Sequence, residues 1–80
     1  MNTDTPLYKA IMESMQSTFP ELTQEELIQS SAGDGHWNSL AHLRLIMKLE
    51  STLGIKVPSD SFAHLTDLHA IAEFLERRAA

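Results

Sequence analysis

The segment from residue 39 to residue 53, SLAHLRLIMKLESTL, constrains the fold of this chain more than any other segment. Its apolar residues recur every three or four positions, which is the spacing of an amphipathic α-helix. A polar run with two glycines, covering 30–38, precedes the segment, and Gly54 follows it where glycine commonly ends a helix. The sequence therefore predicts an α-helix over residues 39–53 that starts after a loop and stops at Gly54.

This predicted helix has two apolar faces. Successive helical residues are separated by about 100°, which places on one face Leu45, Ile46, Leu49 and Leu53, with His42 among them. The roughly opposite face holds Leu40, Leu43 and Met47, beside Arg44, Lys48 and Ser51. Because a small bundle buries one stripe of each helix, the second stripe is either covered by a loop or free to bind a partner. Exposed leucine and methionine next to charges favour a partner-binding stripe.

An earlier helix is predicted over residues 6–18. Thr5 followed by Pro6 is typical of an N-cap and a first helical position, and Leu7 to Phe19 show helical spacing of apolar residues. Pro20 ends this helix. The residues from Thr23 to Glu26 match a capping box, which predicts a short helical turn within the loop that follows.

Two more helices are predicted after residue 54. A short one covers 59–64, and Thr66 with Asp67 caps a last one over 66–78. No stretch alternates with the period of a β-strand for long enough to form one. The sequence therefore predicts a small all-α bundle, with residues 1–80 forming a single domain.

Composition narrows the function. Eighty residues leave room for one small core, and the formal net charge of −5 disfavours nucleic acid, whose phosphates attract basic patches. The chain has no cysteine, which is consistent with a reducing compartment, and no signal peptide or membrane-spanning apolar run. Its four histidines lack the spacing of a helical metal pair. We therefore expect a cytoplasmic protein without a metal, nucleic-acid or membrane partner.

Ser39 is the first residue of the helix over 39–53, and either Ser39 or Asn38 is suited to cap it. A hydroxyl at a helix start is also well placed to carry a phosphate, because free N–H groups and the helix dipole stabilise an anion there. Trp37 either stacks on a ligand or packs onto the bundle. Catalysis is not expected: Trp37 and Ala41 stand where a nucleophile elbow needs glycine, and no base or ligand cluster supports a hydrolase.

The segment GHWNSLAHLRLIMKLESTLGIKVP resembles the acyl carrier protein family. The usual family pattern is D-S-L, an apolar helix, L-E, then G-I and a proline. The order and spacing agree over about 25 residues, and the expected helices follow the family's order over nearly the whole chain. The resemblance is strongest to discrete carriers that read W-D-S-L-x-H-L, so we expect a free-standing carrier.

The resemblance implies a four-helix bundle with a long loop between the first and second helices and a short third helix. It implies that a phosphopantetheinyl transferase attaches 4′-phosphopantetheine from coenzyme A to Ser39, beside Asn38 and Trp37. Acyl, aminoacyl or polyketide intermediates would then ride on the arm as thioesters, in a fatty-acid-like, polyketide or nonribosomal pathway. The partners would be loading, condensing or transferring enzymes that dock on Leu40, Leu43, Arg44, Met47 and Lys48. Such a carrier is a monomer and not itself an enzyme.

Two departures from the family pattern change the expectation. Asn38 stands where the family usually has aspartate, so no negative charge is offered there to a transferase's cation or metal. The family's second helix is typically acidic, whereas here Arg44 and Lys48 outnumber Glu50. The first departure disfavours modification by a generic transferase, and the second favours dedicated partners over the ordinary enzymes of fatty-acid synthesis. The alternative is a small helical adaptor without a prosthetic group, in which Ser39 is only a cap.

Overall fold

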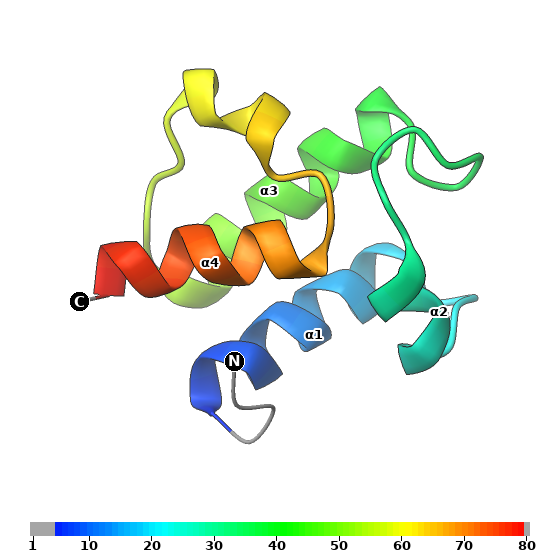
Figure 1. Ribbon diagram of the computed structural model, residues 1–80, viewed down its shortest axis with the longest axis horizontal. Coiled ribbons are helices and arrows are strands. Elements are labelled where there is room, and N and C mark those ends of the chain that lie inside the picture. The colour runs from blue at the N-terminus through cyan, green and yellow to red at the C-terminus, as the bar shows by residue number, and fades with distance from the viewer. Residues whose placement is uncertain (1–4, 80) are drawn as a thin grey trace.

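The structure, a computed structural model, describes residues 5–79. Over this range the chain forms five helical elements and no strand. Figure 1 shows how they are arranged. They are α1 (Pro6–Thr18), α2 (Gln24–Gln29), α3 (Ser39–Leu53), the 3₁₀-helix η1 (Ser59–His64) and α4 (Leu68–Ala79). The predicted all-α class is confirmed.

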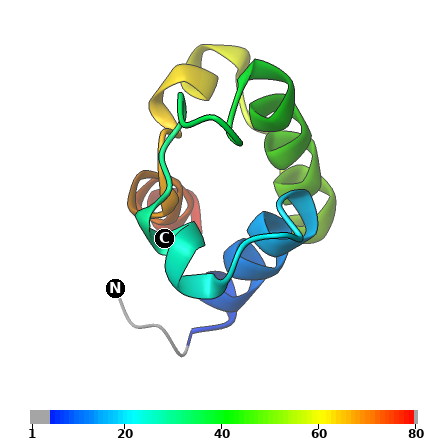
Figure 2. The ribbon, with the colours of Figure 1, turned by 90° about the vertical axis from the view of Figure 1, so that its right-hand side faces the viewer.

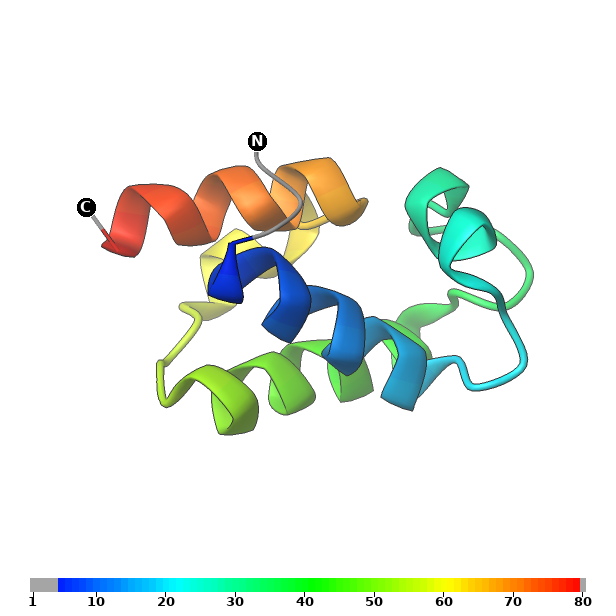
Figure 3. The same ribbon diagram turned by 90° about the horizontal axis from the view of Figure 1, so that it is seen from below.

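Helix α1 is the centre of the packing. It contacts α3, α4 and α2, and Figure 3 shows it lying between α3 and α4, with α2 at the end of the molecule where α1 stops. Seen along its long axis, the molecule is a ring of helices in which η1 lies between α3 and α4 (Figure 2). The interior of this ring is filled by fifteen buried apolar side chains: Ile11, Met12, Met15, Phe19, Leu27, Trp37, Leu45, Ile46, Leu49, Val57, Leu65, Leu68, Ile71, Ala72 and Leu75.

The ends of α1 and α3 follow local rules. The Thr5 hydroxyl accepts a hydrogen bond from the Tyr8 N–H, and Pro6 occupies the first helical position. The Asn38 side chain caps α3, and Gly54 ends it in the left-handed conformation, with φ of 66°. The predicted bounds of both helices are therefore confirmed.

The region between α1 and α3 holds more helix than the single turn predicted. In the capping box, the Thr23 hydroxyl accepts from the Glu26 N–H, and the Glu26 carboxylate accepts from the Thr23 N–H at 2.9 Å. Leu27 then anchors α2 by burying its side chain completely in the core. The predicted long loop is thus divided into two shorter connections by α2.

The predicted start of the last helix was two residues too early. Helix α4 begins at Leu68 because the Asp67 carboxylate caps it, accepting from the Ala70 N–H at 2.7 Å. The carbonyl of Thr66 is used elsewhere: it accepts from the Ala32 N–H at 2.7 Å. The predicted end at 78 falls one residue short of Ala79. The short helix predicted over 59–64 has these bounds but is a 3₁₀-helix.

Candidate site at the start of helix α3

The loop before α3 is held in a defined shape by its own hydrogen bonds. Gly33, with φ of 103°, donates its N–H to the Trp37 carbonyl, which closes a tight turn that glycine accommodates without strain. The Asp34 carboxylate accepts from the Ser31 N–H at 2.9 Å. An isolated antiparallel bridge between Ser31 and Asp67 fastens the loop to the start of α4. These bonds fix the direction in which the chain enters α3.

Trp37 is buried, with 1% of its surface exposed. Its indole N–H donates to Nδ1 of His42 at 2.9 Å, and Nε2 of His42 lies 2.7 Å from the Phe62 carbonyl. Because the indole can only donate, Nδ1 accepts, and the neutral ring carries its proton on Nε2. The interpretation that Trp37 packs onto the bundle is confirmed. The side chain of His42 joins the loop, α3 and η1, a role that sequence spacing did not indicate.

Asn38 caps the helix, and Ser39 does not. The Asn38 Oδ1 atom accepts from the Ala41 N–H at 2.9 Å. Ser39 follows as the first helical residue, is exposed, and its hydroxyl makes no hydrogen bond within the part of the chain that the structure describes. A free hydroxyl therefore projects from the end of a 15-residue helix whose dipole favours an anion.

A hollow of about 360 Å³ opens beside Ser39. It is lined by residues from the loop, the start of α3 and the segment around η1: Ala32, Gly33, Trp37, Asn38, Ser39, His42, Ala63 and Thr66. The hollow thus brings together all three residues predicted at the start of the helix, Trp37, Asn38 and Ser39. Trp37 reaches it from the core while staying buried, and Ser39 from the surface.

The second apolar face of α3 is open. Leu40 is 58% exposed, Leu43 44% and Met47 60%, and together they form what we call the α3 stripe. The alternative that a loop covers this stripe is therefore wrong. On the other face Leu45, Ile46 and Leu49 are buried, as the sequence predicts. Helix α3 therefore has one apolar face in the core and another that no residue in 5–79 covers.

Two cations flank the α3 stripe. Arg44 and Lys48 are exposed and belong to no ion pair between described residues, where the ion pairs all involve Glu73 on α4. Glu50 points its carboxylate elsewhere, accepting from the Val57 N–H at 2.8 Å. The basic side chains beside the stripe are therefore not neutralised within the fold.

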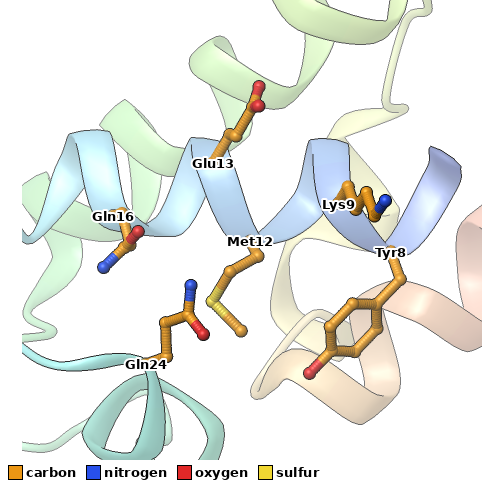
Figure 4. Close-up of a pocket in the computed structure, with 6 residues that line it drawn as sticks. All are labelled: Tyr8, Lys9, Met12, Glu13, Gln16 and Gln24. Carbon is orange, nitrogen blue, oxygen red and sulfur yellow. The ribbon is translucent and has the colours of Figure 1, made fainter. Parts of the chain in front are cut away.

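A larger hollow, of about 510 Å³, lies away from Ser39 and is shown in Figure 4. It is formed by α1 and the start of α2, with Met12 and Gln24 pointing toward each other. Its other lining residues are Tyr8, Lys9, Glu13 and Gln16. Within 5–79, no group of three or more histidine, aspartate or glutamate side chains could hold a metal ion. The predicted site residues Trp37, Asn38 and Ser39 line the hollow at the start of α3, and none of them lines this larger hollow.

The chain matches no protein-family model, no curated protein sequence and no solved structure. None of the helices formed by residues 5–79 has both the length and the apolar character needed to cross a membrane.

Proposed function

We propose that this chain is a carrier protein with an acyl-carrier-like bundle, whose Ser39 bears a 4′-phosphopantetheine arm. The observation that carries the proposal is the exposed Ser39 hydroxyl, which has no hydrogen-bond partner among residues 5–79 and lies at the N-terminus of a long helix. Intermediates of a fatty-acid-like, polyketide or nonribosomal pathway travel on the arm as thioesters. The protein itself catalyses no reaction and acts in the cytoplasm as a monomer.

The residues at the start of α3 fit such an arm. The Ser39 hydroxyl is accessible, and the first turn of α3 offers N–H groups and the positive end of a dipole to the phosphate. The adjoining hollow of about 360 Å³, with Trp37 in its wall, offers an apolar surface to the rest of the arm. When bound, the arm supplies a terminal thiol, which this cysteine-free chain lacks.

Attachment is a phosphoryl-transfer reaction carried out by a phosphopantetheinyl transferase. The Ser39 oxygen bonds to the phosphorus that carries the pantetheine of coenzyme A. The bond from that phosphorus to the bridging oxygen breaks, and adenosine 3′,5′-bisphosphate leaves. A base of the transferase takes the serine proton. No residue of this chain has to act as the base, because the chain is the substrate.

The α3 stripe with Arg44 and Lys48 serves as the docking surface for the transferase and for the loading, condensing or transferring enzymes. It begins one residue after Ser39 and continues along the same helix. The arm on Ser39 therefore lies at the edge of the interface formed by a partner that covers the stripe. Exposed apolar side chains next to charges are suited to contacts that form and separate repeatedly.

Mass spectrometry tests the proposal. The intact protein is incubated with coenzyme A and a broad-specificity phosphopantetheinyl transferase, and its mass is measured. We expect a gain of one phosphopantetheine in the wild type and in Ser59→Ala, which removes another exposed serine at a helix start. Ser39→Ala should fold normally but gain nothing. If no protein gains mass, the carrier proposal is wrong and the adaptor remains. If Ser39→Ala still gains the full increment, the assignment of the arm to Ser39 is wrong.

Asn38 provides a second measurement on the same reaction. Asn38→Asp keeps a good cap, since aspartate and asparagine cap helices almost equally well, and it restores the family's carboxylate. We expect faster modification by a generic transferase with unchanged helix content in circular dichroism. Equal rates would show that the charge at position 38 does not affect recognition.

A further inference from the structure

Basic side chains gather around Met47. Met47 lines two hollows: one of about 430 Å³ also lined by Arg44 and Lys48, and one of about 440 Å³ also lined by Lys56. The chain has six lysine and arginine residues against eleven aspartate and glutamate residues. Three of the six therefore lie next to one exposed methionine, which is a strong segregation of charge in an acidic protein.

None of these three cations forms an ion pair with a carboxylate among residues 5–79. In the described part of the chain, ion pairs link Glu73 to His69 and Arg77, all on α4. The one acidic residue that lines either hollow is Glu50, and its Oε2 atom is occupied by the Val57 N–H. The surface around Met47 is thus locally positive although the whole chain carries −5.

The centre of this surface is apolar. Met47 is 60% exposed and Leu43, one helical turn away on the same face, is 44% exposed. An unbranched methionine adapts its shape to a partner more readily than other apolar residues. An apolar centre with a charged rim is the usual layout of a protein–protein contact.

We propose that Leu43, Arg44, Met47, Lys48 and Lys56, the Met47 surface, bind a protein partner that presents carboxylates around an apolar socket. The identity of this partner as an enzyme acting on the carrier rests on the proposed function; its acidic chemistry rests on the charges. Because the chain repels acidic molecules over most of its surface, an acidic partner is steered to this one face.

A protein fits this surface better than an anionic membrane or a nucleic acid. An interfacial helix buries a face with tryptophan, phenylalanine and leucine in lipid, whereas the exposed apolar face of α3 consists of Leu40, Leu43 and Met47 and has no aromatic side chain. Single-stranded nucleic acid is bound by aromatic stacking as well as by cations, and the tryptophan of this chain is 1% exposed.

Two synthetic helical peptides serve as probes. Both have leucines at i, i+4 and i+7, and the flanking positions are glutamate in one and lysine in the other. They are titrated into the unmodified protein while the Met47 methyl and the backbone amides are followed by NMR. We expect the glutamate peptide to shift Met47 and Leu43, with binding that weakens as salt is added. The lysine peptide should bind at least about tenfold more weakly, because its charges are repelled by the rim.

Charge reversal is the decisive comparison. Arg44→Glu with Lys48→Glu should reverse the peptide preference. Lys9→Glu with Arg77→Glu is the matched control, because it makes the same two kinds of substitution and the same change in net charge on α1 and α4. This control should keep the preference of the wild type.

The proposal is overturned if neither peptide shifts Met47, if the lysine peptide binds as well, or if the control pair reverses the preference too. Shifts of Met47 on addition of phosphatidylserine vesicles, or on raising the protein concentration alone, would identify a membrane or a second copy instead. The unmodified protein is used throughout, so a failure here leaves the assignment of Ser39 untouched. Equally, loss of the carrier assignment would not alter these titrations.

Discussion

Substitution of His42 should destabilise the fold, because its side chain makes two hydrogen bonds beside the candidate site. Its Nδ1 accepts from the Trp37 indole at 2.9 Å, and its Nε2 donates to the Phe62 carbonyl at 2.7 Å. His42→Ala leaves the Trp37 N–H without an acceptor in a side chain that is 1% exposed. An unsatisfied buried donor costs about 1–3 kcal/mol, and a lost hydrogen bond about 0.5–1.5 kcal/mol. The expected destabilisation is therefore about 2–4 kcal/mol.

Such a loss is large for a chain of this size. At roughly 0.05–0.15 kcal/mol per residue, the whole fold is stable by about 4–12 kcal/mol. Each kcal/mol lowers the melting temperature of a small domain by about 4–8 °C. Thermal unfolding followed by circular dichroism should thus show a fall of at least about 8 °C for His42→Ala.

His64→Ala is the matched control, because His64 is exposed and lies at the end of η1. A surface substitution of this kind changes stability by less than about 0.5 kcal/mol. If His42→Ala melts as His64→Ala does, the hydrogen bonds of His42 do not stabilise the fold. Nitrogen NMR of the imidazole gives an independent answer: the proton should be on Nε2, and a proton on Nδ1 would refute the donor and acceptor assignment.

Three further outcomes are expected. In urea unfolding, Ile46→Ala should lower the free energy of unfolding by about 2–5 kcal/mol, because its side chain is fully buried. Met47→Ala should lower it by less than about 0.5 kcal/mol, because Met47 is 60% exposed, and equal losses would contradict this. Gly54→Ala should cost about 1–2 kcal/mol because Gly54 has a left-handed φ, whereas Gly35→Ala should change little; similar values would disprove it. The backbone hydrogen bond from Thr23 lowers the pKa of Glu26 below its usual value. The Glu26 carboxylate therefore stabilises α2 fully above the pKa of Glu26 in the unfolded chain, and this stabilisation is lost as the pH falls through its pKa in the folded protein. An NMR titration that gives a raised pKa for Glu26 would refute this.

The parts of the fold that local chemistry determines could be predicted from the sequence. Pro6, Asn38 and Gly54 set helix ends through caps that involve residues within one turn. The start of α4 could not be placed as well, because the Thr66 carbonyl is taken by Ala32, more than thirty residues earlier in the chain. The Asp67 cap that starts the helix is local, but the contact that holds Thr66 outside it joins distant segments, and sequence periodicity carries no information about that contact.

The candidate site divides in the same way. The angular positions of residues on one helix place the α3 stripe away from the core face. They left open whether a loop covers the stripe and whether Ser39 or Asn38 caps the helix, and the structure decides both questions. The burial of Trp37 against His42 depends on the shape of the loop from Ser31 to Trp37, which is set by turns and by the bridge to Asp67. The five-residue separation of Trp37 and His42 was visible, but nothing in it distinguished a hydrogen bond from chance.

The local charge around α3 could not be obtained by counting the charged residues of that helix in the sequence. In the sequence, Glu50 offsets one of the two cations, Arg44 and Lys48. In the structure, the Glu50 carboxylate accepts the Val57 N–H, and Lys56 joins the hollow beside Met47. At about 1.5 Å per residue, this positive region is centred about 12 Å along the helix from Ser39. Under the proposed function, the modified hydroxyl is on the first residue of α3 and the positive region lies near the middle of the helix and beyond. We therefore expect a charge reversal at Arg44 and Lys48 to change partner binding while the hydroxyl and its cap stay intact.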